Sequence, residues 1–251
     1  MKKLVRGVGI ALFWLLVWHA ASMAVNSALF LPSPVATVQS LLRLMQQASF
    51  WQAALYSILR VSAGYLLAVV VGAVLGVLTA GSQLFDVLLR PICSVMKATP
   101  VVSFALLMVL WLPEQMVPVF AAFVMVLPLT WTNVREGIRE TDQNLLEMAR
   151  LFRFGKMKTL RLVYFPSVLP GLLAACATGL GFAWKAGVAA EVIARTADSI
   201  GKHLVESKSY LEIADMFAWT AVVVALSVLF ERLLLGFFYR LQRRRGEGKG
   251  I

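Results

Sequence analysis

The sequence predicts an all-α protein, a multi-pass bundle of transmembrane helices, and its composition and hydropathy lead to this class. Hydrophobic residues make up 60% of the 251 residues, charged residues make up only 15%, and the mean hydropathy is +0.79. A soluble domain carries about a quarter charged residues, and apolar runs this long do not fit together inside one soluble core. We therefore expect one transmembrane domain over residues 1–251 with six spans. Residues 1–54 would form the first span and an amphipathic helix, residues 55–240 the core bundle, and residues 241–251 a basic cytoplasmic tail.

The charge balance is strongly basic, with a formal net charge of +11. In a soluble protein this charge would indicate nucleic acid as a partner. Here the basic residues stand at the ends of apolar runs and are not interleaved with aromatic residues on a polar surface. The positive-inside rule and contact with anionic lipid head groups explain them, so we expect a lipid bilayer and no nucleic acid.

The cysteines and histidines show no pattern of a metal or redox site. Cys93 and Cys176 lie far apart in apolar surroundings, and His19 and His203 have no companion ligands at suitable spacing. We expect structural thiols, no metal site, no cofactor and no catalytic residue in this chain.

The first apolar run follows a basic N-terminus and has two interpretations. A secretory signal with a weak cleavage site at residues 22–24 is one, but the apolar run is longer than a signal core and further spans follow it. A retained first span is therefore expected, with the N-terminus in the cytoplasm. Ser33 and Pro34 then predict the cap and first residue of an amphipathic helix on the outer surface, over residues 35–50.

The second span is predicted between Arg60 and Asp86, because no charged residue occurs between them. Gly64, Gly72 and Gly76 recur near one face of this helix. Gly72 and Gly76 form a Gly-x-x-x-Gly pair, which allows a second helix to approach closely.

The remaining spans follow from the apolar runs and the prolines. A third span would run to Trp111 with Pro100 interrupting it, and the fourth would cover residues 116–131. After a polar, basic region come a fifth span, residues 166–193, and a sixth, residues 216–238. Six spans place both termini and the basic region on one side, and the loops on the other side carry no basic excess, as the positive-inside rule requires.

Residues 147–170 differ from the rest of the chain because they are basic and amphipathic and lead directly into an uncharged run. The pattern Glu147-x-Ala149, a basic helical stretch, then Leu169-Pro170 resembles the EAA motif of bacterial ABC importer permeases. In that family this loop is a coupling helix that docks in a groove of the ATPase subunit. The residues that the resemblance assigns to coupling here are Glu147, Met148, Ala149, Arg150, Arg153, Gly155 and Lys156.

The resemblance extends over most of the chain. The segments LPSP, SILRVSAGYLLAVVVGAVLG, AWKAGVAAEVIA and FAWTAVVVALSVLFERL look like the nitrate/sulfonate/taurine branch of these permeases, in the same order. A type I importer of this kind implies a second permease copy, separate ATP-binding subunits and an extracytoplasmic substrate-binding protein.

The EAA-like stretch departs from the family pattern at two positions. Met148 replaces the first alanine, and Arg153 stands where the family has glycine, with Gly155 two residues later. We expect from this that the helix continues past Arg153 before it turns.

The chain contains no Gly-x-x-x-x-Gly-Lys-[Ser/Thr] phosphate loop. Residues 201–203, Gly-Lys-His, lack both the hydroxyl residue and the spacing. ATP hydrolysis is therefore expected on a separate subunit, with ATP bound there.

The candidate translocation residues are Trp184, Lys185, Glu191 and Lys97. A charged side chain inside the bilayer costs about 2.5–3.5 kcal/mol on insertion scales, so it should face the bundle interior or water. Lys185 would suit an anionic solute. In the alternative interpretation, both lysines extend to the membrane surfaces and Glu191 pairs with Arg195 one helical turn on.

The expected function is the permease subunit of an ATP-driven importer in the bacterial inner membrane. The alternative is a self-sufficient secondary transporter or channel, although no inverted repeat is visible and the spans contain few ionisable residues. An intramembrane enzyme would need paired His or Asp residues within the spans, which the sequence lacks. The solute stays open among nitrate, sulfonates, taurine and unrelated small metabolites.

Overall fold

The computed structural model describes residues 2–246, and all regular secondary structure in this part of the chain is helical. Residues 247–251, which belong to the predicted basic tail, lie outside the described residues. The helices are α1 (Lys2–Val25), α2 (Pro34–Met45), α3 (Ala48–Gly81), α4 (Gln83–Ala98), α5 (Val101–Trp111), α6 (Val117–Arg139), α7 (Gln143–Leu151), α8 (Lys156–Thr159), a π-helical turn (Leu160–Tyr164), α9 (Phe165–Ala194), α10 (Ile200–Ser209) and α11 (Ile213–Gly246).

Within the described residues, four helical stretches are long and apolar enough to cross a membrane, as expected for the second, fourth, fifth and sixth spans. They are Ala48–Gly81, Val117–Arg139, Lys156–Ala194 and Ile213–Leu233. The helix pair α4 and α5 would make a fifth crossing if the pair is one span, and α1 contributes a shorter apolar segment, Gly9–Val25. The all-helical, multi-pass character predicted from composition is therefore confirmed.

The predicted third span is not one continuous helix. Helices α4 and α5 meet at an angle of 104°. The break falls at Thr99, which has an extended backbone, and Pro100. Proline disfavours the helical conformation of the residue before it, so α4 ends ahead of Pro100. The predicted interruption is therefore a bend between two separate helices.

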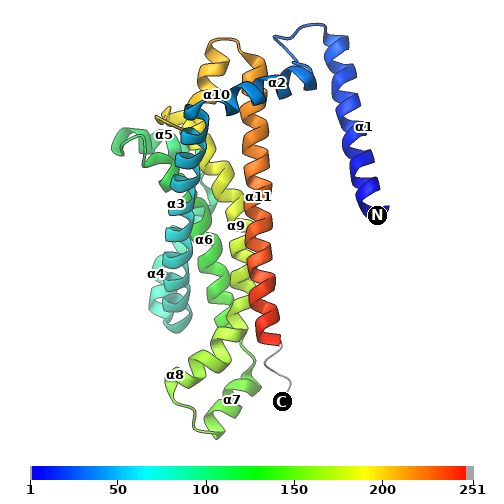
Figure 1. The fold of residues 1–251 in the computed structure, drawn as a ribbon. Coiled ribbons are helices and arrows are strands. Elements are labelled where there is room, and N and C mark those ends of the chain that lie inside the picture. Colours follow the sequence, from blue (N-terminus) through cyan, green and yellow to red (C-terminus); the bar gives the residue numbers. More distant parts are fainter. Residues whose placement is uncertain (1, 247–251) are drawn as a thin grey trace.

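The long helices α3, α6, α9 and α11 run alongside one another, as Figure 1 shows. Helices α7 and α8 lie at one end of this bundle, here called the α7 end. Helices α2 and α10 lie at the opposite end, the α10 end (Figure 1). α1 stands beside the bundle; its Trp18 donates a hydrogen bond to the carbonyl of Pro32 and stacks on Phe217 of α11.

The start of α2 confirms the predicted cap. The hydroxyl oxygen of Ser33 accepts a 3.1 Å hydrogen bond from the backbone N–H of Ala36, and Pro34 occupies the first helical position. The apolar residues Val35, Val38 and Leu42 are exposed. An amphipathic helix with an uncovered apolar face suits the membrane surface.

The glycines of α3 allow α6 to pack at close range, as the Gly-x-x-x-Gly pair predicted. A Cβ at Gly64 would overlap the carbonyl oxygen of Val119, and one at Gly76 would lie 2.6 Å from Cβ of Val134. Gly187 of α9 meets Val61 of α3 in the same way. Small residues therefore bring α6 and α9 against α3.

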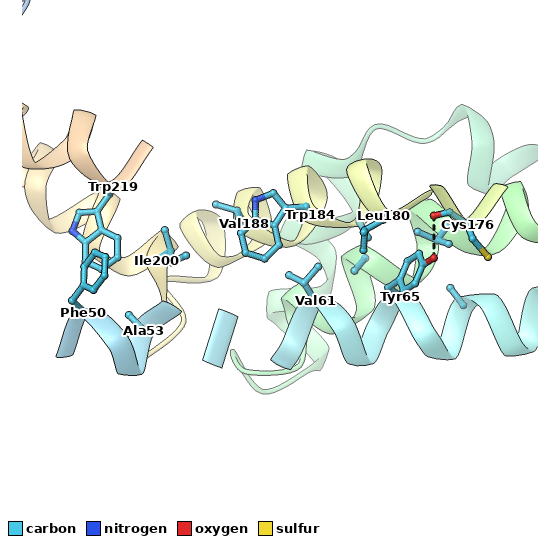
Figure 2. Packing of buried hydrophobic residues seen from close by; sticks show 14 of the residues in the cluster. Phe50, Ala53, Val61, Tyr65, Cys176, Leu180, Trp184, Val188, Ile200 and Trp219 are labelled. Carbon is cyan, nitrogen blue, oxygen red and sulfur yellow. Dashed lines mark hydrogen bonds between the residues drawn. The ribbon is translucent and has the colours of Figure 1, made fainter. Parts of the chain in front are cut away.

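Larger side chains fill the core where α3 packs against α9 and α11 (Figure 2). At the α10 end, the rings of Phe50 and Trp219 lie 4.9 Å apart, which joins α3 to α11. Further along the core, the hydroxyl of Tyr65 donates a 3.0 Å hydrogen bond to the carbonyl of Cys176, which joins α3 to α9 (Figure 2). The core thus holds three long helices in a defined register.

Candidate coupling helix and translocation elements

Helix α7 carries most of the predicted coupling residues and follows directly on α6. The Asp142 carboxylate caps it by accepting a 2.8 Å hydrogen bond from the N–H of Asn144. Ala149 is buried, at 2% exposure, so it fixes the inner face of the helix. The other predicted coupling residues are all exposed: Glu147, Met148, Arg150, Arg153, Gly155 and Lys156.

The expectation that α7 continues past Arg153 is wrong. The helix ends at Leu151, and Arg153 adopts a left-handed backbone with φ of 51°. The N–H of Phe154 donates a 2.8 Å hydrogen bond to the carbonyl of Ala149, and the N–H of Arg153 donates a 3.0 Å bond to the carbonyl of Arg150. These two bonds form a Schellman motif, the helix ending that usually has glycine at the left-handed position. The turn therefore occurs where the family has glycine, with arginine in its place.

Gly155 does not take over the role of the displaced glycine. Its φ is −66° and it precedes the first residue of α8, a conformation open to any residue. The conformational freedom of glycine is thus not used at this position, and the direction of the chain is set at Arg153.

The tip between α7 and α8 also presents apolar side chains that the sequence interpretation did not include. Leu151, Phe152 and Met157 are 83%, 71% and 75% exposed. The Lys158 ammonium lies 4.1 Å from the centre of the Phe154 ring. A mixed apolar and cationic tip of this kind is typical of a protein contact surface. The amphipathic pattern of this stretch was the available signal for it.

The four predicted translocation residues do not form one site. Trp184 is buried; its Nε1 donates a 2.9 Å hydrogen bond to the carbonyl of Val223, and its ring packs against Phe230. Trp184 therefore joins α9 to α11. Figure 2 shows its side chain in the core near Val188 and Val61. Lys185 of α9 and Lys97 of α4 are both exposed in the chain. Glu191, in contrast, is completely buried.

Glu191 connects three helices near the α10 end. Its Oε2 accepts a 2.8 Å hydrogen bond from the hydroxyl of Ser57 on α3 and a 3.2 Å bond from the N–H of Gly201 on α10. Nη1 of Arg60 lies 3.9 Å from its Oε1. The predicted alternative partner Arg195 instead ends α9 with φ of 51°. The pairing one turn along the helix is therefore replaced by partners on other helices.

The loop between α9 and α10 is fixed by the same group of residues. Arg60 donates hydrogen bonds of 3.1 Å to the carbonyls of Ala197 and Asp198. On the other side, the Glu114 carboxylate accepts a bond from the N–H of Ala197, and Thr196 donates to the Glu114 carbonyl. Residues 195–199 are thereby tied to α3 and to the turn before α6.

A second buried carboxylate organises the α7 end, and the sequence interpretation missed it. Asp86 is 5% exposed and accepts hydrogen bonds from Arg90, Arg135 and Arg139 at 2.8–3.0 Å. Arg139 also donates to the carbonyl of Thr79 at the end of α3. The sequence does show charged residues four positions apart, Asp86 and Arg90 in α4 and Arg135 and Arg139 in α6. No feature of the sequence indicates that these two pairs meet.

Metal binding has no support in the part of the chain that the structure describes. No group of three or more His, Cys, Asp or Glu side chains gathers there. Cys93 and Cys176 are both buried and unpaired with another cysteine.

Comparison with known proteins identifies relatives over nearly the whole length. The putative aliphatic sulfonates transport permease protein SsuC of Bacillus subtilis is 28% identical over 242 residues, covering 93% of this chain and 85% of that protein. The taurine transport system permease protein TauC of Escherichia coli is 25% identical, with 92% and 86% covered. The bicarbonate transport system permease protein CmpB of Synechococcus elongatus is 24% identical, with 76% and 68% covered.

Solved structures share the fold. A crystal structure of an amino acid ABC transporter with histidines superposes with a TM-score of 0.56 at 18% identity, covering 74% of this chain and 91% of that one. The MetNI methionine ABC transporter in inward-facing conformations gives the same TM-score and identity, with 77% and 93% covered.

The family model for the binding-protein-dependent transport system inner membrane component matches residues 68–247, which include α7, α9 and the buried carboxylates of both ends. The chain therefore belongs to this family of ABC importer permeases, on the branch that includes the sulfonate, taurine and nitrate permeases.

Proposed function

We propose that this permease crosses the bacterial inner membrane six times, with its α7 end in the cytoplasm. The bent pair α4 and α5 and the helix α1 would supply the two crossings beyond the four long apolar helices. The basic residues of positions 135–161 cluster at the α7 end, and the positive-inside rule assigns such a cluster to the cytoplasm. Both termini would then be cytoplasmic.

Helices α7 and α8 are the proposed docking element for a separate ATPase subunit. The supporting observation is the shape of the tip: a capped short helix with buried Ala149, a tight turn at Arg153, and exposed Leu151, Phe152 and Met157. Exposed apolar side chains next to cations bind a partner through apolar burial, with the charges selecting the orientation. The sequence carries no phosphate loop of its own, so ATP would be bound and hydrolysed by that partner.

The other proposed partners are a second permease copy and an extracytoplasmic substrate-binding protein. The family description itself names dependence on a binding protein. Apolar side chains are exposed on α3, α4 and α5. They form surfaces that a second copy of the permease and the lipid bilayer would cover. A homodimer is the simplest assembly for a chain with one coupling element.

The proposed solute is a small anion. Relatives are named as permeases for aliphatic sulfonates, taurine and bicarbonate, and the cationic side chains of Lys185 on α9 and Lys97 on α4 are exposed in the single chain. Uptake by a Lys185→Met variant tests whether Lys185 lines the solute path. Normal uptake with normal coupling to ATP hydrolysis would show that Lys185 is not in the path.

Copurification with the ATPase tests the docking proposal. An Arg153→Glu change reverses a charge at the tip and should abolish capture of the ATPase by the tagged permease. Retained copurification together with retained transport would contradict docking through this face. Solute transport by the permease alone in liposomes, driven by an ion gradient, would instead establish a secondary transporter.

A further inference from the structure

We propose that Arg60 of α3 switches its hydrogen bonds between two partners during transport, the loop of residues 195–199 and the carboxylate of Glu191. In the structure Arg60 holds this loop, which connects α9 to α10. In the second arrangement Arg60 bonds to Glu191, and the loop is released. Arg60 is in this role a positioning residue, because it acts through the loop and contacts no solute. The inference rests on the proposed function in one respect, since ATP binding to a partner subunit would drive the switch.

Arg60 holds the loop through both terminal nitrogens of its guanidinium. Nη2 donates a 3.1 Å hydrogen bond to the carbonyl of Ala197, and Nη1 donates one of the same length to the carbonyl of Asp198. The side chain of Arg60 is only 15% exposed, and its guanidinium lies 5.6 Å from the centre of the Tyr56 ring. Two bonds from one planar fork to consecutive carbonyls fix both the position and the orientation of the loop.

The two oxygens of Glu191 differ in their partners. Oε2 accepts hydrogen bonds from the hydroxyl of Ser57 and the N–H of Gly201. Oε1 is buried and accepts no hydrogen bond from the residues that the structure describes. Nη1 of Arg60 lies 3.9 Å from Oε1, which is too far for a hydrogen bond. Because buried polar atoms are nearly always hydrogen-bonded, this oxygen indicates a second arrangement in which Arg60 bonds to it.

Arg60 and Glu191 stay near each other in both arrangements. Ser57 and Arg60 both lie on α3, and the hydroxyl of Ser57 holds the Glu191 carboxylate beside this helix. A charge-assisted hydrogen bond spans about 2.7–2.9 Å, so Nη1 has to move only about 1 Å to bond to Oε1. The switch therefore needs a shift of the guanidinium and no movement of α9 along α3.

The loop, in contrast, is tied on its other side to the turn between α5 and α6. The hydroxyl of Thr196 donates a 3.0 Å hydrogen bond to the carbonyl of Glu114, and the N–H of Ala197 donates a 3.1 Å bond to the Glu114 carboxylate. If this turn moves away from α3, the loop follows Glu114 and its carbonyls leave Arg60. The guanidinium then bonds to Oε1 of Glu191, the oxygen that is unsatisfied while the loop is held.

The backbone of the loop favours its release. Arg195 and Asp198 have left-handed backbones, with φ of 51° and 46°. Residues other than glycine adopt this conformation at a cost in free energy, and it persists only where surrounding contacts hold it. The bond from Arg60 to the carbonyl of Asp198 is such a contact. Each arrangement thus satisfies one group at the expense of another: the held loop satisfies its carbonyls, and the released loop satisfies Oε1 of Glu191 and relaxes Asp198.

The bent pair α4 and α5 connects the turn at Glu114 to the α7 end. Asp86 in α4 accepts hydrogen bonds from Arg135 and Arg139 in the last two turns of α6, and α7 follows directly on α6. At the other end of the pair, α5 leads into the turn with Glu114 and buries only two of its 11 residues. Elements with few buried side chains move most readily. Docking at α7 is thereby connected to the loop through hydrogen-bonded and covalently continuous elements.

Hydrogen exchange in the purified permease–ATPase complex in detergent tests the switch. The complex is measured without nucleotide and after trapping with ATP, Mg²⁺ and vanadate. The N–H of Thr196 bonds to the carbonyl of Glu191 at 3.2 Å while the loop is held. We expect residues 195–199 to exchange about tenfold faster in the trapped complex, because the loop then leaves both Arg60 and this carbonyl. Residues 143–155 of the docking element are followed in the same samples and report whether the nucleotide acts on the permease.

Two variants separate the switch from a purely structural role. Glu191→Gln keeps one acceptor oxygen but places an amide nitrogen where Arg60 would bond, so the loop should exchange slowly with and without nucleotide. Arg60→Lys has a single donor group that cannot hold both loop carbonyls, so the loop should exchange rapidly in both conditions. Arg43→Lys is the matched control, because it makes the same change at an arginine of the α10 end that pairs with Asp215. It should keep the nucleotide dependence of the parent.

Three results separate failure of the switch from failure of the proposed function. Loop exchange that is unchanged or slower on trapping, in a complex whose docking element responds to nucleotide, would overturn the switch and leave the proposed function standing. Nucleotide-dependent loop exchange that persists in Glu191→Gln would overturn it as well, since release would then not require this carboxylate. A permease that does not capture the ATPase, or whose docking element does not respond to nucleotide, would contradict the proposed function instead.

Discussion

The hydroxyl of Ser57 on α3 donates a 2.8 Å hydrogen bond to Oε2 of Glu191 on α9, and both side chains are completely buried. The same Ser57 oxygen accepts a 3.0 Å bond from the N–H of Ile200. One buried carboxylate and one hydroxyl thereby hold α3, α9 and α10 together. The parts of these helices at the α10 end are therefore expected to move as a unit.

Glu191→Ala should lower the stability of the permease. The change leaves the hydroxyl of Ser57 and the N–H of Gly201 without an acceptor, and each unsatisfied buried group costs about 1–3 kcal/mol. Glu191→Gln keeps an acceptor oxygen and should be milder. Thermal unfolding in detergent, followed by size-exclusion fluorescence, measures the difference. Equal losses in the two variants would show that the hydrogen bonds to Ser57 and Gly201 do not stabilise this region.

Gly64→Ala should disrupt the packing of α3 on α6. The added Cβ would overlap the carbonyl oxygen of Val119, so one helix must move away, at a cost of about 1–3 kcal/mol. Gly81→Ala on the same helix is the matched control, because a Cβ there meets nothing within 4 Å. The melting temperatures of the two variants test this close contact. A Gly64→Ala protein as stable as the control would mean that α6 does not approach α3 this closely.

Arg153→Gly should stabilise the end of α7. A non-glycine residue with a left-handed backbone costs about 1 kcal/mol, and glycine removes that cost while keeping the turn. Arg153→Val keeps a Cβ, adds branching at it and should destabilise the same turn. Hydrogen exchange at the N–H of Phe154, which closes the turn, reports the effect. Faster exchange in the glycine variant than in the parent would contradict the strain at Arg153.

A comparison of Arg153→Gly with Arg153→Glu separates backbone strain from charge. If the cation contacts the ATPase, both variants weaken copurification, and the glutamate variant does so more strongly. If only the turn matters, the glycine variant binds the ATPase as well as the parent does.

Asp86→Asn should destabilise the α7 end of the bundle by about 3–5 kcal/mol, because three guanidinium groups then lack their shared anion. High salt should recover part of the loss by screening the repulsion. Arg90→Ala is the control: its side chain is 60% exposed, so its ion pair contributes less than about 1 kcal/mol. Melting temperatures at low and high salt test both statements; a salt-independent loss in Asp86→Asn would argue against electrostatic repulsion.

His203 on α10 should make stability depend on pH. Burial against Trp219, whose ring lies 4.8 Å away and parallel, lowers the pKa of His203 below its ordinary value of 6.5; Lys202 adds to this, whereas Glu206 and Asp198 oppose it. The unfolded chain therefore binds the proton more readily than the folded protein. The stability that the folded protein has with His203 neutral is therefore fully present above pH 6.5. It is lost as the pH falls through the lower pKa that His203 has in the folded state. His203→Phe keeps the stacking without a titrating group and should flatten this part of the stability profile. An unchanged profile in His203→Phe would assign the pH dependence to other groups.

Much of the fold follows from local sequence features. The long apolar runs placed the four long spanning stretches, Ser33 and Pro34 predicted the start of α2, and the α3 glycines predicted a close helix contact. The error involves the backbone conformation of a single residue: at Arg153 the chain turns where a longer helix was expected. At Pro100 the predicted interruption is present, as a bend of 104° between α4 and α5.

The sequence by itself determined the membrane class, the order of the helices and the position of the basic, amphipathic stretch at α7 and α8, because hydropathy, charge asymmetry and capping residues act over a few neighbouring positions. Tertiary structure alone decided which side chains meet. Ser57 and Glu191 are 134 positions apart, and Asp86 and Arg139 are 53 apart, so no periodicity within one helix links them. Their pairing depends on the register in which the glycines of α3 and α9 let neighbouring helices pack.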